Sequence, residues 1–248
     1  MSSSHRTPEV ILLPKTFSTP ADLDDIANHY KGLRLQGLLS DPNSFSSTFE
    51  RESQFTLDIW RSRIQNPVAK TFVSVLDGND KISSKTIGPD TTGSDHSKAK
   101  GFQNLPQTEW VGTVTLLGPE IWSRQDGDAI SQTWDLFTKA KDVPQQALKP
   151  RDYSGAHVVY LIAGMFVLPH ARRKGHGQQL VEAAVGHVRD EAKNLGAWNA
   201  SIVLQASQAA TSAQLFYEQV GFEAREESVM DSSPYTAMVR DVNLQMDE

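Results

Sequence analysis

The sequence predicts a single α/β (α+β) domain spanning residues 1–248, with a mixed, mostly antiparallel central sheet and flanking helices. Two observations predict this class. In the last third of the chain the order strand, helix, strand, helix indicates a parallel pair at the centre of a sheet. Elsewhere, strand patterns that follow one another as hairpins indicate antiparallel pairing. Because 38% of the 248 residues are hydrophobic, the chain can bury a sizeable core.

The chain opens with a predicted strand followed by a helix. Residues 9–17 are rich in Val, Ile and Leu, which are typical of a strand. Thr19 fits the cap of the next helix, since Pro20 suits its first position and Asp22 completes a capping-box spacing. Apolar residues then recur at helical spacing, and we expect the helix to end by Asp41 because a proline follows.

A second helix, a hairpin and a polar insertion come next. Residues 57–64 predict a short helix with Trp60 facing inward. Residues 70–78 and 110–118 alternate as strands and are expected to pair with each other. Between them, residues 80–106 are dense in Ser, Thr, Gly, Asp and Lys. We expect them to form a mobile insertion loop, because so few apolar groups cannot offset the cost of ordering the chain.

The last third of the chain has the clearest pattern. Residues 125–156 lack regular periodicity and predict a second insertion, whereas residues 157–168 are almost wholly apolar, as in a central strand. A helix follows, with its apolar face marked by Leu180, Val181, Ala184, Val185, Val188, Ala192 and Leu195. Residues 200–207 predict a strand and residues 210–220 a helix. The tail fits a final hairpin.

Composition excludes several classes of function. The net charge of −6 argues against nucleic acid as a partner, because phosphate binding needs an excess of Lys and Arg. No cysteine is present, which rules out thiolate nucleophiles and disulfides. The seven histidines lack the spacing of metal ligands, so no metal is expected. Without a signal peptide or an apolar run of bilayer length, we expect no membrane contact and a location in the cytoplasm or nucleus.

One stretch combines positive charge, glycine and a predicted helix start. Residues 169–180, Pro-His-Ala-Arg-Arg-Lys-Gly-His-Gly-Gln-Gln-Leu, join the apolar strand to the next helix. The first backbone N–H groups of a helix have no helical partner, and the helix dipole adds partial positive charge there. Arg172, Arg173 and Lys174 add full charges. Such an arrangement suits a phosphate or pyrophosphate.

The stretch matches neither of two common phosphate motifs but resembles a third. It lacks the Gly-Lys-Ser/Thr of a P-loop, and Leu180 replaces the third glycine of a dinucleotide fingerprint. The pattern Arg-x-x-Gly-x-Gly, at Arg172, Gly175 and Gly177, resembles the acetyl-CoA pyrophosphate loop of the GNAT superfamily of N-acetyltransferases. The segment 212–224 resembles the helix and turn that close the acetyl-CoA site in that family, through Ala213, Tyr217, Gly221 and Phe222.

The resemblance implies a function, a cofactor and a set of site residues. The function is transfer of acetyl from acetyl-CoA to a primary amine of a small molecule or peptide, by direct attack in a ternary complex. The parallel strands would splay, and a bulge at Gly164 would free an N–H near Met165 or Phe166 as an oxyanion donor. Tyr217 would protonate the thiolate leaving group. The residues implied to hold the cofactor are Phe166, Val167, Arg172, Arg173, Lys174, Gly175, His176, Gly177, Gln178 and Tyr217.

Two departures from the family pattern leave questions open. Ala210 stands where many members have an Asn that helps hold the cofactor, with Gln208 or Ser207 as substitutes. Leu161 stands where some members have a Glu, so the general base is not identified. The candidates are Glu50, Glu120, His157, Tyr160 or a water chain to one of them. A non-catalytic CoA-binding module and a nucleotide-binding protein remain as alternatives, and both a monomer and a homodimer fit the sequence.

Overall fold

The computed structural model describes residues 8–76, 105, 108–122, 137, 151–230 and 233–245. Within these residues, one sheet has the strand order β1-β2-β3-β4-β5-β7-β6. The strands are β1 (Glu9–Leu12), β2 (Ala69–Leu76), β3 (Glu109–Ile121), β4 (His157–Val167), β5 (Asn199–Ser207), β6 (Glu223–Met230) and β7 (Ser233–Val242). The helices are α1 (Pro20–Ser40), α2 (Phe49–Ser53), α3 (Leu57–Gln65), α6 (His176–Asn194) and α7 (Thr211–Gln219), with short 3-10 turns η1 (Pro42–Ser44) and η6 (Pro169–Ala171).

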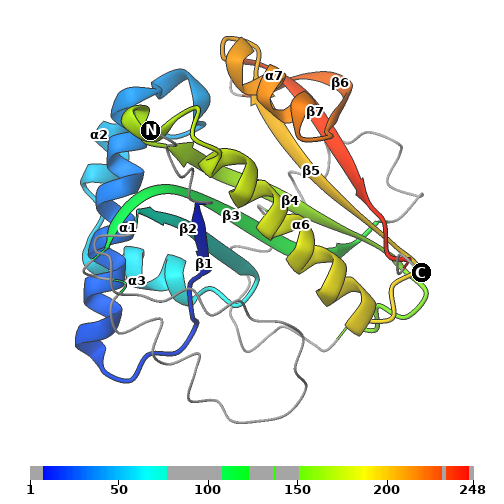
Figure 1. Ribbon diagram of the computed structural model, residues 1–248, viewed down its shortest axis with the longest axis horizontal. Coiled ribbons are helices and arrows are strands. Elements are labelled where there is room, and N and C mark those ends of the chain that lie inside the picture. The colour runs from blue at the N-terminus through cyan, green and yellow to red at the C-terminus, as the bar shows by residue number, and fades with distance from the viewer. Residues whose placement is uncertain are drawn as a thin grey trace, which may run out of the picture.

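The sheet is mixed and mostly antiparallel, as the sequence predicted. The pair β2 and β3 and the pair β6 and β7 are antiparallel, which confirms both hairpins. The strands β4 and β5 form the parallel pair. Helix α6 connects them and crosses the sheet (Figure 1). The predicted fold class is therefore correct.

The parallel pair separates along its length. Pairing runs from His157 opposite Asn199 to Leu161 opposite Val203, and no pairing of β4 with β5 is found beyond that point in the described chain. Both strands nevertheless continue, β4 to Val167 and β5 to Ser207. Figure 1 shows the two strands diverging toward their C-terminal ends. The predicted splay is therefore present, and it leaves the β5-facing edge of β4 without a strand partner.

A bulge marks the same part of β4. The register places Thr113 of β3 opposite Phe166 and Thr115 opposite Ala163, so β4 has one residue more than β3 over this interval. Gly164 lies within it and has a φ of +61°, a conformation that favours glycine. The predicted bulge at Gly164 is confirmed, and one residue in it lacks a regular place in the ladder.

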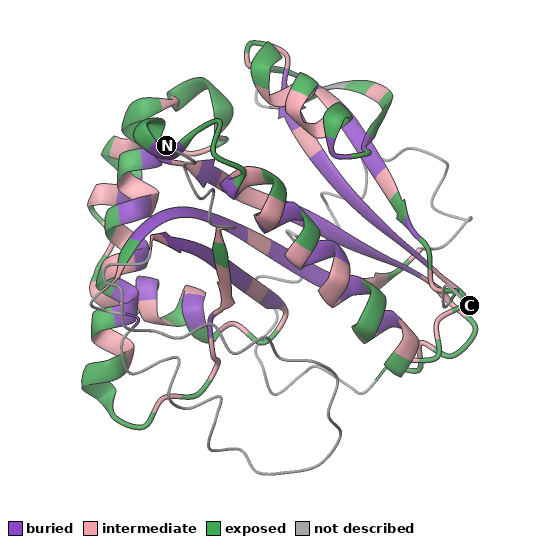
Figure 2. Cartoon of the chain, in the orientation of Figure 1, coloured by how far each residue is buried: buried purple, intermediate pink, exposed green. Residues whose placement is uncertain are grey.

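The sheet is covered on both faces, and each face has its own core. On one face, apolar residues of α6 and α7 pack on β4, β5 and β7. On the other face, α1 and α3 pack on β2 and on the end of β4. A further buried group on this second face includes Val159, Leu161 and Val203. The strands β2, β3, β4, β5 and β7 are the most buried elements, whereas β6 and the outer sides of the helices are mostly exposed (Figure 2).

Local sequence signals explain where the first elements begin and end. The Thr19 hydroxyl accepts a hydrogen bond from the Asp22 amide (3.2 Å), and the Asp22 carboxylate accepts one from the Thr19 amide (3.0 Å). The predicted capping box thus starts α1, which ends before Asp41 as expected. Trp60 of α3 is fully buried. The prediction of strand over residues 9–17 was too long. β1 ends at Leu12, and in the described chain only the Leu13 amide continues the pairing, by donating to the Thr71 carbonyl (2.8 Å).

The two predicted insertions fall mostly outside the described residues. Of residues 80–106 the structure describes Leu105, which is buried and accepts a hydrogen bond at its carbonyl oxygen from the Trp110 indole (3.0 Å). Of residues 125–156 it describes Phe137, which is buried, and residues 151–156. Among the helices that the structure describes, none is both long and apolar enough to cross a bilayer.

Candidate functional site

The start of α6 presents unpaired backbone N–H groups. The first hydrogen bond of the helix runs from the Gln179 amide to the Gly175 carbonyl (3.0 Å), so the amides of residues 176–178 have no helical acceptor. No side chain caps this end of the helix. Gly175 has a φ of +87°, a conformation that allows the sharp turn from loop to helix. The geometry is that of an anion site.

The three cations of the loop differ in what their side chains do. The Arg172 guanidinium forms an ion pair with Asp41 and donates to the Val167 carbonyl (2.9 Å), which ties the loop to the end of α1. Arg173 and Lys174 are exposed, and neither forms an ion pair with a described residue. Arg173 and Lys174 therefore carry positive charges beside the α6 amides that no described residue neutralises.

The side chain of His176 points into the protein. It is 4% exposed, and its Nδ1 lies 2.8 Å from the hydroxyl of Ser74 on β2. Burial, together with the nearby positive charge of Lys174, lowers its pKa below the ordinary value, so the imidazole is neutral at physiological pH. His176 can thus contribute its backbone N–H to an anion, while its side chain fixes the loop to the sheet.

Gly177 lies where three elements meet. A Cβ atom built at this position would lie 3.2 Å from the Phe216 ring of α7 and 3.4 Å from the Met165 side chain of β4. The first turn of α6 therefore approaches α7 and the β4 bulge closely, which brings the two sequence motifs together. Gln178, the next residue, is exposed.

Phe166 and Val167 have separate roles for side chain and main chain. The Phe166 ring is buried among residues of α1 and α3, and a Cβ atom at Gly37 of α1 would lie 3.0 Å from its Cγ. Their main chain belongs to the part of β4 that has separated from β5. An extended ligand can pair with such an edge, as it does in strand addition.

Tyr217 lies on α7, on the α6 side of the sheet. Its ring makes edge contacts with Phe216 and Phe222, at centroid distances of 5.4 and 5.5 Å. Burial raises the pKa of its hydroxyl above the ordinary value, so the hydroxyl stays protonated at neutral pH. No residue in the described part of the chain forms a hydrogen bond with it, and the hydroxyl is free to donate to a ligand.

The turn before α7 lacks the family's asparagine. The cap residue Ala210 offers no side-chain hydrogen bond to the helix. The Ser207 hydroxyl accepts from the Ala209 amide (3.3 Å), and the Gln208 amide donates to the Pro234 carbonyl (3.0 Å). The Ser207 side chain and the Gln208 backbone shape this turn.

The four candidate bases do not gather at the gap. His157 starts β4 and contacts Ser201 (2.7 Å), about 30 Å along the strand from Phe166. Tyr160 is fully buried beneath α6, and Glu120 forms an ion pair with Arg151 beside the start of β4. Glu50 is exposed on α2. We therefore assign no base among them.

Seven side-chain polar atoms in the described residues are buried without a hydrogen-bond partner. Two of them are the Nη1 of Arg34 on α1 and the Oε1 of Gln205 on β5, and the others belong to Ser47, Trp60, Tyr160, His187 and Glu191. Gln205 belongs to no sequence motif, and for both residues the lack of a partner follows only from their neighbours in the fold.

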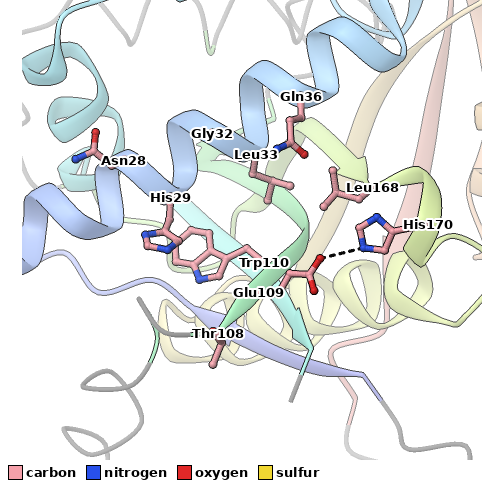
Figure 3. Close-up of a pocket in the computed structure, with 10 residues that line it drawn as sticks. All are labelled: Asn28, His29, Gly32, Leu33, Gln36, Thr108, Glu109, Trp110, Leu168 and His170. Carbon is pink, nitrogen blue, oxygen red and sulfur yellow. Dashed lines mark ion pairs between the residues drawn. The ribbon is translucent and has the colours of Figure 1, made fainter. Parts of the chain in front are cut away.

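A surface pocket of about 630 Å³ lies elsewhere, between α1, the start of β3 and η6 (Figure 3). Trp110 and His29 lie side by side in it, and Glu109 pairs with His170 (3.1 Å). It contains none of the predicted site residues. Among the described residues, no three His, Asp or Glu side chains cluster as metal ligands would.

Comparison with known proteins matches the C-terminal part of the chain to a family. Residues 140–224 match the model of the acetyltransferase (GNAT) domain. This range contains the Arg-x-x-Gly-x-Gly loop, α6, β5 and α7. No curated protein matches the chain.

Similar folds occur among solved structures. An acetyltransferase of the GNAT family from Streptococcus pneumoniae is 11% identical, with a TM-score of 0.50 over 95% of this chain and 100% of that one. Arabidopsis thaliana NAA60, solved with acetyl-CoA, is 12% identical, with a TM-score of 0.49 over 95% and 99%. Spermidine N-acetyltransferase from Vibrio cholerae, solved with CoA and spermine, is 13% identical, with a TM-score of 0.46 over 95% and 96%.

The family model and the fold agree with the two sequence motifs. The splayed parallel pair, the bulge in β4 and the uncapped start of α6 all lie within the segment that the model matches, and the sheet around them is GNAT-like. Residues 140–224 are therefore similar to a GNAT acetyltransferase domain, in agreement with the resemblance seen in the sequence.

Proposed function

We propose that this protein transfers an acetyl group from acetyl-CoA to a primary amine, by direct attack in a ternary complex. The observation that carries the proposal is the gap between β4 and β5, which opens beside the uncapped N-terminus of α6. In one place the chain thus offers an anion site and an unpaired strand edge. A coenzyme with a diphosphate and an amide-bearing arm needs both.

The residues present fit the coenzyme. The amides of residues 176–178, with Arg173 and Lys174 beside them, would hold the diphosphate. The edge of β4 that has separated from β5 at Phe166 and Val167 would pair with the amide-bearing arm, while the Val167 carbonyl also accepts from Arg172. Arg172 would act by fixing the loop to Asp41 and to the end of β4.

In the proposed reaction, acetyl-CoA supplies the acetyl group as an activated thioester. The amine nitrogen forms a bond to the acetyl carbon while the carbon–sulfur bond breaks. An N–H in the β4 bulge near Met165 would stabilise the negative charge that develops on the carbonyl oxygen. Tyr217 would donate its proton to the departing thiolate, and the proton lost by the amine would pass to solvent.

The experiment is a release assay with the full chain. Acetyl-CoA is mixed with amino acids, peptides, polyamines and aminoglycosides, and free thiol is measured with a chromogenic reagent. The chain contains no cysteine, so all thiol signal comes from CoA. We expect release that depends on the amine and increases with enzyme concentration.

The matched variants are Gly175→Val and Gly186→Ala. The first forces a branched side chain into a φ of +87° at the start of α6, and we expect it to abolish coenzyme binding measured by calorimetry. The second lies in the same helix, where an added Cβ meets nothing within 4 Å, and should leave binding intact.

Three outcomes separate the proposal from its alternatives. Coenzyme binding without release on any amine would favour a non-catalytic CoA-binding module. Binding of ATP or NAD in preference to CoA would favour a nucleotide-binding protein. Loss of both binding and release in Gly175→Val alone would support the acetyltransferase.

A further inference from the structure

A cluster of buried charge lies on the face of the sheet opposite α6. Glu52 of α2 is 1% exposed and accepts hydrogen bonds from two arginines. Arg34 of α1 donates through Nε (3.2 Å) and Nη2 (2.9 Å), and Arg63 of α3 donates through Nη1 (2.7 Å). Burial by itself would raise the pKa of Glu52, but the hydrogen bonds from Arg34 and Arg63 outweigh it and lower the pKa to about 2. The three side chains therefore carry a net charge of about +1 at neutral pH.

One nitrogen of this cluster is unused. Two of the three guanidinium nitrogens of Arg34 donate to Glu52, whereas its Nη1 is buried and has no partner. The Arg34 side chain is 12% exposed. A buried N–H without an acceptor costs free energy of about 1–3 kcal/mol, so the position favours a ligand that supplies one.

The unused nitrogen lies beside the bulge of β4. A Cβ atom built at Gly164 would have Arg34 Nη1 as its nearest neighbour, at 3.7 Å. Phe45 lies against the guanidinium, with its ring centroid 4.5 Å from Arg34 Cζ, and limits where the group can move. Because residue 164 has no side chain, Arg34 Nη1 faces the backbone of the bulge, where an atom at the Cβ position would be in ordinary van der Waals contact with it.

A second unused group lies across the gap, on the same face. Val203 of β5 belongs to the buried group of the face opposite α6, whereas Ile202 and Leu204 belong to the core beneath α6. Side chains alternate along a strand, so Gln205 shares the side of Val203. Continuing the parallel register past Leu161 and Val203 sets Gln205 opposite Ala163, next to Gly164. Its Oε1 is buried and lacks a donor.

The two groups are complementary to one molecule. Arg34 Nη1 needs an acceptor, preferably an anion because of the net positive charge of its cluster. Gln205 Oε1 needs an N–H donor. They stand on either side of the gap in which the thioester would lie according to the proposed function, and on the face that α6 and α7 leave free.

We propose that the acceptor of this protein is an α-amino acid, with its carboxylate on Arg34 Nη1 and its amine against Gln205 Oε1. The inference rests on the proposed function for the position of the thioester. It also disfavours polyamines as acceptors, because they bring positive charge to a positive cluster and have no group for Arg34.

The test compares matched acceptors. Each of the standard amino acids is assayed beside its α-amide and its decarboxylated amine, at neutral pH with saturating acetyl-CoA. We expect kcat/KM of the preferred amino acid to exceed that of its decarboxylated amine by about tenfold or more, because a hydrogen bond to a charged group is worth that factor. Equal values for acid, amide and amine would overturn the inference, while the acetyl transfer itself would stand.

Two arginine variants separate a contact from a structural effect. Arg34→Lys keeps a positive charge for Glu52 but removes the nitrogen that faces Gly164. Arg63→Lys makes the same change at the other partner of Glu52, away from Gly164. We expect the acid-to-amine ratio of kcat/KM to fall toward one in Arg34→Lys and to stay at the wild-type value in Arg63→Lys. An unchanged ratio in Arg34→Lys would overturn the assignment.

A binding measurement keeps the inference independent of turnover. Amino acids at millimolar concentration should raise the melting temperature of the wild type and of Arg63→Lys, and should leave that of Arg34→Lys unchanged. Gln205→Leu should weaken binding of the amino acid and of its decarboxylated amine by a similar factor, because both share the amine. If no amino acid shifts the wild-type melting temperature and none is preferred in turnover, the inference is wrong.

Discussion

Tyr217 is the residue whose replacement tests the chemical step alone. Tyr217→Phe removes the hydroxyl but keeps the ring contacts with Phe216 and Phe222. We expect kcat to fall about 100-fold, the lower range for loss of a general acid, with coenzyme affinity within about twofold of the wild type. Steady-state kinetics and calorimetry measure the two effects separately.

The control for Tyr217→Phe is a second tyrosine far from the gap. Tyr153 donates its hydroxyl to the Pro119 carbonyl (3.3 Å), beside the start of β4. Tyr153→Phe should leave kcat close to the wild-type value. If Tyr217→Phe also retains full turnover, Tyr217 has no part in proton transfer and the proposed acid must be sought elsewhere.

His176 predicts how stability depends on pH. Burial lowers its pKa in the folded protein, as it does for His157 and His187. Below the ordinary value near pH 6.5, the unfolded chain therefore binds protons that the folded chain does not, and the free energy of unfolding falls as the pH falls. Each such imidazole contributes a slope of at most about 1.4 kcal/mol per pH unit.

The measurement is urea unfolding at a series of pH values from 7.5 to about 5.5. His176→Gln removes one titrating group while leaving a side chain that can reach Ser74. We expect a shallower loss of stability with falling pH in the variant than in the wild type. Parallel curves for the two proteins would show that His176 is not protonated on unfolding in this range.

At the scale of elements, the approach of α1 to β4 depends on a glycine. A Cβ atom at Gly37 would lie 3.0 Å from the Phe166 ring, which is itself buried. We expect Gly37→Ala to lower the free energy of unfolding by about 1–3 kcal/mol, because α1 must move away from the strand edge. Movement there would also displace Arg34 from the bulge, so amino-acid acetylation should fall with stability.

The same helix supplies the matched control. At Gly32 an added Cβ meets nothing within 4 Å. Gly32→Ala should raise stability by up to about 1 kcal/mol, because alanine is the better helix former. Urea denaturation of both variants measures the difference. Equal effects of the two substitutions would mean that the contact between Gly37 and Phe166 does not limit the packing of α1.

Element ends were predictable from the sequence where a local signal fixes them. The capping box at Thr19 and the proline after Asp41 defined α1, and long apolar patterns defined β4 and α6. The end of β1 was missed because Leu13, which follows it, is equally apolar. The pattern of apolar residues predicts which residues are buried better than it predicts where the hydrogen bonds between two strands end.

At the scale of the whole molecule, motifs located the site but did not say what each side chain does. Arg172 and His176 lie in the predicted loop, yet one side chain holds Asp41 and the other holds Ser74. Such contacts join residues more than 100 positions apart, and no local pattern records them. The same holds for Gln205, whose unsatisfied oxygen has meaning only because β4 and β5 diverge beside it.

Glu52 links the three helices α1, α2 and α3, so its replacement should destabilise the whole molecule. Glu52 of α2 bridges Arg34 of α1 and Arg63 of α3. In Glu52→Gln, Arg34 and Arg63 face a neutral amide, whose oxygen can accept hydrogen bonds but cannot neutralise their positive charge. We expect a loss of about 3 kcal/mol in the free energy of unfolding at pH 7, the lower range for breaking a buried pair. Since the folded pKa of Glu52 is about 2, the loss should persist down to about pH 4.5 and shrink as the pH falls toward 2.

A more accessible ion pair between the same helices provides the contrast. Asp24 of α1 pairs with Arg61 of α3 (2.5 Å) where both side chains are about one-third exposed, so solvent screens the charges more than at Glu52 and the pair contributes less. Asp24→Asn should therefore change the unfolding midpoint in urea far less than Glu52→Gln does. Comparable shifts in the two variants would mean that burial of Glu52 adds nothing to the pairing. In that case the positive cluster would not be held beside the β4 bulge by this carboxylate, and the contact proposed for Arg34 would lose its support.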